Sequence, residues 1–172
     1  NYFLEWDIIK PLKFRTAFST TYANGEEKIF LPAFMENVED SNSPYKISRL
    51  THNSFNNNSW QLENTLTYNL HKKDHRLTVM GGFTMQYYRT QYANLFATGL
   101  PWEAWKNQNL WYAGQGTTVT GEDGGSEKSY VSYLGRITYT LKGRYNVIAT
   151  GRVDGSSAYP KDNRYGFFPS LG

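Results

Sequence analysis

The amino-acid sequence predicts an all-β fold, an antiparallel up-and-down meander that forms an incomplete segment of a large transmembrane β-barrel. Apolar and polar residues alternate over six long segments, as they do in strands with two different faces. Short and long connections alternate between these segments. Aromatic residues make up 17% of a chain whose mean hydropathy is only −0.64. That is more ring surface than a soluble domain of this hydropathy usually carries.

The first two expected strands, residues 2–9 and 12–23, show the alternation most simply. Leu4 and Trp6 share one face of the first strand, and Glu5 lies on the other. The same pattern continues in residues 59–70, 75–92, 129–142 and 144–154, and the residues from Tyr165 on are expected to begin a seventh strand. About six strands and the start of a seventh are therefore predicted, each long enough for the ~9–11 residues of a tilted membrane strand.

The connections follow one rule. Strands one and two, three and four, and five and six meet at "KP", "HKKDH" and "KGR", which we expect to be tight turns. Residues 24–58 and 93–128 are expected to be long loops, because "NSFNNNS" and "GEDGGSE" are rich in Asn, Ser and Gly. Short turns at one end and long loops at the other are typical of a transmembrane barrel. A soluble β-sandwich is the alternative, but its strands average only ~5–6 residues.

The two faces of the strands predict their surroundings. We expect lipid on the apolar face, which carries Trp6, Phe14, Phe18, Trp60, Leu66, Phe83, Tyr139 and Val147. We expect the lumen or a plug on the polar face, which carries Arg15, Glu63, Arg76, Arg136 and Arg152. Charged side chains are costly in lipid and tolerated in a wet or plugged lumen. For any single one of these residues, a role in solvating and cross-linking the wall is the simpler interpretation.

Composition argues against several classes of function. The chain has no cysteine and a net charge of +3 without a cluster of Lys or Arg, so no nucleic-acid partner is expected. His52, His71 and His75 have no nucleophile at a meaningful spacing, and no enzyme activity, catalytic residue, metal site or cofactor is predicted.

One expected loop carries a group of aromatic residues, namely Trp102, Trp105, Trp111 and Tyr112. These rings are candidates for stacking on a sugar or for contact with a partner protein. Packing of the rings on one another as a small loop core is the alternative, and it is the simpler one.

The last third of the chain carries specific motifs. "SYLGRITYTLKGRY" is followed by "RVDGSS" and "NRYGFFPS", and "WQLENTLTYN" occurs earlier, from Trp60 to Asn69. These stretches resemble the SusC/RagA family of TonB-linked outer-membrane transporters of Bacteroidota. The chain departs from the family pattern at Ala158-Tyr159-Pro160, which affects only a loop.

The resemblance implies a location and partners. Residues 1–172 would be an internal part of a TonB-dependent transporter barrel in the outer membrane of a Gram-negative, Bacteroidota-like cell, without the plug domain. The segment would form the wall of an importer of oligosaccharides or peptides. Its partners would be the remaining barrel and plug, outer-membrane lipid, the TonB complex and a SusD-like surface lipoprotein. A passive outer-membrane barrel or adhesin, and a soluble carbohydrate-binding β-sandwich, remain the alternatives.

Overall fold

A computed structural model describes residues 1–33, 47–101 and 112–172. Its strands are β1 (Tyr2–Ile9), β2 (Leu12–Leu31), β3 (Arg49–Lys72), β4 (His75–Thr98), β5 (Thr118–Leu141), β6 (Tyr145–Ser156) and β7 (Tyr165–Leu171). Two short 3₁₀ helices, η2 (Ala113–Gln115) and η3 (Lys161–Asn163), lie in the connections. Within residues 1–33, 47–101 and 112–172, no helix is long and apolar enough to cross a bilayer.

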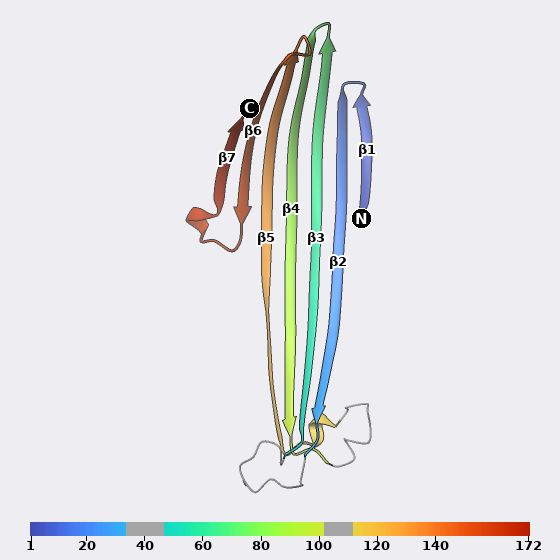
Figure 1. The fold of residues 1–172 in the computed structure, drawn as a ribbon, viewed down its shortest axis with the longest axis vertical. Coiled ribbons are helices and arrows are strands. Elements are labelled where there is room, and N and C mark those ends of the chain that lie inside the picture. Colours follow the sequence, from blue (N-terminus) through green and yellow to red (C-terminus); the bar gives the residue numbers. More distant parts are fainter. Residues whose placement is uncertain (34–46, 102–111) are drawn as a thin grey trace. The chain divides into compact units, whose positions relative to one another are not determined.

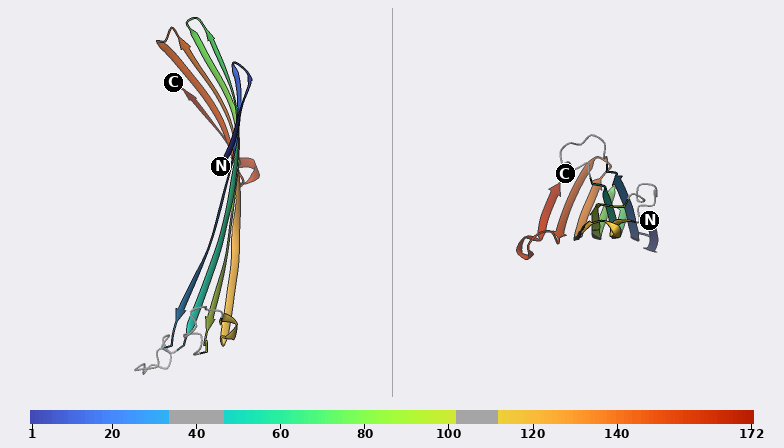
Figure 2. Two further views of the ribbon diagram at one scale, coloured as in Figure 1. Left: turned by 90° about the vertical axis from the view of Figure 1, so that its right-hand side faces the viewer. Right: turned by 90° about the horizontal axis from the view of Figure 1, so that it is seen from below.

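All seven strands belong to one sheet and follow one another in chain order (Figure 1). β1 pairs antiparallel with β2, β5 with β6, and β6 with β7. The two views of Figure 2 also show β6 and β7 side by side. This order confirms the predicted up-and-down meander. The described residues form no second sheet, so the β-sandwich interpretation is wrong.

The predicted tight turns are confirmed. β3 and β4 meet through Lys73 and Asp74, and β5 and β6 meet through residues 142–144. Lys73 (φ 51°), Lys142 (φ 52°) and Gly143 (φ 67°) have the left-handed backbone conformation that tight hairpin turns use. The amide of Arg144 closes the second turn on the carbonyl of Leu141 at 3.0 Å.

The predicted long loops, residues 24–58 and 93–128, are wrong over much of their length. β2 and β3 extend through residues 24–31 and 49–58, and β4 and β5 extend through residues 93–98 and 118–128. The apolar residues of these segments do not alternate regularly with polar ones, so alternation does not mark the segments as strands. They are strands because each continues a hairpin already begun, and pairing with a neighbour outweighs intrinsic propensity.

Contacts divide the chain into two compact units. Unit 1 comprises Asn1–Thr21, Asn58–Arg89 and Glu127–Gly172, and unit 2 comprises Tyr22–Asn57 and Thr90–Ser126. The buried apolar side chains of the described residues all belong to unit 2, and they are Leu50, Ala97 and Leu100. The described part of unit 1 has no buried apolar side chain, although it contains most of the aromatic residues.

Candidate functional site

The candidate functional site is the part of the sheet that lies in unit 1, where the two faces differ in chemistry. On β1 and β2, Trp6 lies opposite Phe14, and Tyr2 lies opposite Phe18. This face is apolar, as the sequence predicts. All four residues have even numbers, and the odd positions between them form the second face, because side chains alternate across a strand.

The second face of β1 and β2 is charged. Glu5 lies opposite Arg15, and Asp7 lies opposite Lys13. Arg15 Nε is 3.7 Å from a Glu5 carboxylate oxygen, and Lys13 Nζ is 3.8 Å from both Glu5 and Asp7. These exposed pairs neutralise each other, so this part of the face is polar with little net charge.

The same division holds on β5, β6 and β7. On the apolar face, Tyr133 lies opposite Val153, which lies opposite Phe167. On the polar face, Arg152 Nε donates to Asp154 at 2.7 Å, and Arg152 Nη2 donates to Ser132 Oγ at 3.3 Å. The motif "RVDGSS" therefore places an Arg–Asp pair on one side of the sheet and Val153 on the other.

Ring pairs on the apolar face show how far it extends along β4. Trp60 stacks on Tyr87 with a centroid separation of 6.1 Å. Toward the turns, the Tyr139 hydroxyl is 2.7 Å from His75 Nδ1. From Leu77 to Tyr87 the chain advances ten positions, or about 33 Å of strand at ~3.3 Å per residue. A tilt of about 40° turns that length into about 25 Å, the height of the apolar band on outer-membrane barrels.

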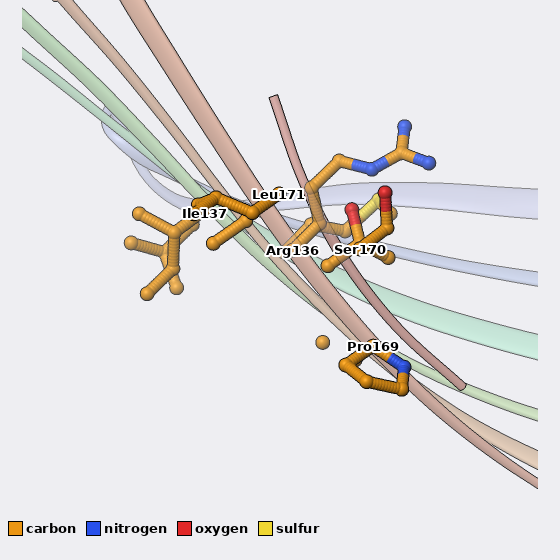
Figure 3. A pocket seen from close by; sticks show the side chains of 11 residues that line it. Arg136, Ile137, Pro169, Ser170 and Leu171 are labelled. Atoms are coloured by element: carbon orange, nitrogen blue, oxygen red, sulfur yellow. The ribbon is translucent and has the colours of Figure 1, made fainter. Parts of the chain in front are cut away.

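A shallow apolar groove crosses this face. Gly135 lies opposite Gly151, which lies opposite Pro169, so three neighbouring strands present no large side chain there. The groove has a volume of about 790 Å³, and its lining includes Val79, Ile137 and Leu171. Figure 3 shows the side chain of Arg136 directed away from that of Ile137, its neighbour in β5. The two faces are thus separated residue by residue.

The five predicted lumen-facing residues lie in unit 1. Arg15 and Arg152 form the ion pairs described above, and Glu63 accepts a hydrogen bond from Gln61. Arg136 lies opposite Thr150, and Arg76 lies beside His75 at the start of β4. Within the described part of the chain, neither Arg76 nor Arg136 forms an ion pair with Asp or Glu.

The predicted aromatic loop is described only at its end. Trp102, Trp105 and Trp111 lie outside the described residues. Tyr112 packs, partly buried, against the cluster of Leu50, Ala97 and Leu100. In residues 1–33, 47–101 and 112–172, no group of three or more His, Asp or Glu side chains is placed to hold a metal ion.

The sequence did not predict the long-range contacts between residues of unit 2. Ser48 is buried, and its hydroxyl accepts from the amide of Leu100 at 2.8 Å and donates to its carbonyl at 3.1 Å. On β3, the ring of Phe55 covers Gly25 of β2. A glycine separated from an aromatic residue by thirty positions is a signal only once the strand register is known.

A sheet of long strands with one apolar face and one ion-paired face is typical of one class, the wall of an outer-membrane β-barrel. Known proteins agree with this class. The chain is 26% identical over 99% of its length to TonB-dependent receptor P26 of Formosa agariphila, and 29% identical over 99% to TonB-dependent receptor P3 of that organism. A stretch of 46 residues is 52% identical to TonB-dependent receptor SusC of Bacteroides thetaiotaomicron. No protein-family model matches the chain.

Solved structures show the same fold. The RagAB peptide transporter superposes on 98% of the chain with a TM-score of 0.83 at 20% identity, and the closed-closed state of the RagAB peptide importer gives 0.82 at 21%. The chain spans 17% and 16% of the two Formosa receptors and 18% of the RagAB chain. The chain is similar to a barrel segment of SusC-like TonB-dependent receptors, which confirms the resemblance predicted from its motifs.

Proposed function

We propose that residues 1–172 are part of the barrel domain of an energy-coupled importer in the outer membrane of a Gram-negative, Bacteroidota-like cell. The complete protein takes up oligosaccharides or peptides. Its plug, its remaining strands and its TonB-contacting segment lie in other parts of the receptor. The observation that carries this proposal is the two-faced sheet of unit 1, together with similarity to TonB-dependent receptors along 99% of the chain.

The two faces have different roles in this proposal. The face of Trp6, Phe14 and Tyr139 contacts lipid, because large exposed apolar surfaces mark sites of contact with a membrane or another protein. The face of Arg15, Glu63 and Arg152 lines the lumen. Arg76 and Arg136 receive acidic side chains of the plug, since neither has an ion-pair partner among the described residues.

The proposed partner at the cell surface is a SusD-like lipoprotein. The family resemblance supplies its identity, and Trp102, Trp105 and Trp111 supply the candidate contact. Indole rings are enriched at the energetic centres of protein interfaces. Replacing Trp102 and Trp105 by Ala in the complete receptor is expected to reduce co-purification of the lipoprotein. Co-purification at the wild-type level with a folded barrel would contradict this part of the proposal.

Energy coupling separates this proposal from a passive barrel. The gene for the complete receptor is deleted, and growth is measured on a panel of polysaccharides and peptides as sole nutrients. The strain is then complemented with the intact receptor or with a version that lacks its TonB-contacting segment. We expect growth on at least one nutrient to be lost and to be restored by the intact receptor alone. Restoration by both versions would show a passive barrel instead.

A further inference from the structure

The two faces of unit 2 are covered unequally. Leu50 of β3 and Ala97 of β4 are 1% and 0% exposed, and Phe30 and Tyr112 pack on them. Phe55 of β3 and Tyr92 of β4 lie on the other face and are 48% and 45% exposed. Of the described residues, none buries these two rings. Phe55 occupies an odd position of β3, as Glu63 does, and the proposed function assigns those positions to the lumen.

Phe55 and Tyr92 are neighbours whose rings lean apart. Ser54 Oγ donates to the carbonyl of Ala93 at 3.4 Å, so in an antiparallel pair the next two residues lie side by side. The ring of Phe55 covers Gly25 of β2, and the ring of Tyr92 lies 2.6–2.9 Å from the point that a Cβ on Gly124 of β5 would occupy. The far end of each ring therefore lies over a neighbouring strand at a glycine, which leaves room for it.

The next pair toward the loops repeats this arrangement with polar groups. Asn53 Nδ2 donates to Glu27 Oε2 at 2.9 Å, and Asn94 Nδ2 donates to Glu122 Oε1 at 2.9 Å. Both amides lean away from the line where β3 meets β4. Two half-exposed rings and two amide–carboxylate pairs thus lie next to one another on this face, and we call them the β3–β4 seam, which consists of Phe55, Tyr92, Asn53, Asn94, Glu27 and Glu122.

We propose that the β3–β4 seam is a binding site for a neutral oligosaccharide. The negative face of an aromatic ring attracts the C–H groups on the face of a sugar ring. Carboxylate oxygens accept hydrogen bonds from the adjacent hydroxyl groups, and carboxamide groups both donate and accept. Planar polar groups beside half-exposed aromatic rings are therefore complementary to a chain of sugars.

The same observations argue against two other ligands. A peptide that binds as an added strand needs a free sheet edge, and β3 and β4 are interior strands between β2 and β5. An acidic glycan would bring its charge beside Glu27 and Glu122. This inference rests on the proposed function, because it requires the seam to face the lumen of an importer.

Three variants of the complete receptor test the seam. Phe55→Ala and Tyr92→Ala each remove one ring. Gly124→Ala keeps Tyr92 but places a methyl group where its ring lies, so the ring must lift. Two matched controls leave the seam intact. Tyr22→Ala removes another ring of unit 2, which is 62% exposed. Tyr22 lies on the face that carries Asn56, and the Asn56 amide donates a hydrogen bond to the Tyr22 hydroxyl. Gly114→Ala adds a methyl group with no atom within 4 Å.

The measurement is binding of the detergent-purified receptor to an array of neutral oligosaccharides, acidic oligosaccharides and peptides. We expect a neutral oligosaccharide to bind the wild type and both controls. We expect each seam variant to bind it about tenfold more weakly, as the loss of one stacked ring implies. Any of three results would overturn the inference. The wild type could bind only peptides or acidic glycans, it could bind no glycan, or the seam variants could bind the neutral oligosaccharide as well as the controls do. TonB-dependent growth is measured separately, so an importer whose seam binds no sugar remains distinguishable from a failed importer.

Discussion

Strands β2 to β5 contribute to both units, and the two units use them in opposite ways. In unit 1 many apolar side chains are exposed, as Leu4 (62%), Tyr133 (51%) and Ile137 (49%) show, and none of those described is buried. In unit 2 three apolar side chains of the described residues are buried, although its strands are largely polar. The described part of unit 1 thus has the exposed apolar surface of a protein in an apolar solvent, whereas unit 2 has a small buried core of the kind that forms in water.

Truncation of the small core is expected to have the largest effect, and to be confined to unit 2. Leu50→Ala removes a side chain that is 1% exposed and should cost about 2–5 kcal/mol through lost burial and the cavity left behind. Hydrogen exchange of the folded variant receptor should be accelerated, relative to the wild type, more in Thr90–Ser126 than in Glu127–Gly172. Phe55→Ala, on the opposite face of the same strand, is the control and should change exchange little. Equal acceleration in both units would break the comparison.

A charge on the apolar face is expected to separate the units by solvent. Phe83 packs on Tyr133 with a ring separation of 5.1 Å, near the middle of the apolar band. Phe83→Arg should destabilise the barrel by about 2–4 kcal/mol in urea titrations of the complete receptor in lipid vesicles. Thr84→Arg on the other face, and Gln91→Arg at an odd position of β4 in unit 2, should each stay within about 0.5 kcal/mol. A similar loss in all three would show that the face does not contact lipid.

Replacing Ser48 tests whether a buried hydrogen-bonded hydroxyl also contributes to the stability of unit 2. Ser48→Ala leaves the amide of Leu100 without its partner in a buried place and is expected to cost about 1–3 kcal/mol. Local exchange at Gly99 and Leu100 is the measurement. Ser54→Ala removes an exposed hydroxyl from the same unit and should leave this exchange unchanged. An unchanged exchange rate in Ser48→Ala as well would mean that the two hydrogen bonds between Ser48 and Leu100 do not stabilise unit 2.

The smallest effect is expected for the ion pairs of unit 1. Arg15→Gln removes a contact of 3.7 Å with Glu5 in which both side chains are about half exposed. Such pairs contribute at most about 1 kcal/mol, and salt weakens them. Urea titrations at low and high salt should therefore differ less for the variant than for the wild type. A loss well above 1 kcal/mol would indicate that this pair is sealed from water, as it would be beneath a tightly docked plug.

Hydrophobic periodicity was sufficient to predict the wall of unit 1. Glu5, Trp6 and Asp7 alternate so regularly that the period of two defines the strand, its faces and its neighbours in the meander. The strands of unit 2 were not predictable in this way. Asn53 and Glu27 lie in segments whose few apolar residues follow no regular alternation, and composition alone marks such segments as loops. They become strands because neighbouring hairpins supply their backbone hydrogen bonds.

The sequence by itself determined the fold class, the order of the strands, the two faces of the wall and the resemblance to its family, because these depend on local alternation and short motifs. Only the tertiary structure decided how far each strand extends, and that Phe55 lies over Gly25, Tyr92 over Gly124 and Asn94 beside Glu122. Such pairs lie about thirty positions apart in the chain. Their contact depends on strand register, which is set by cooperative pairing along the whole hairpin rather than by the residues themselves.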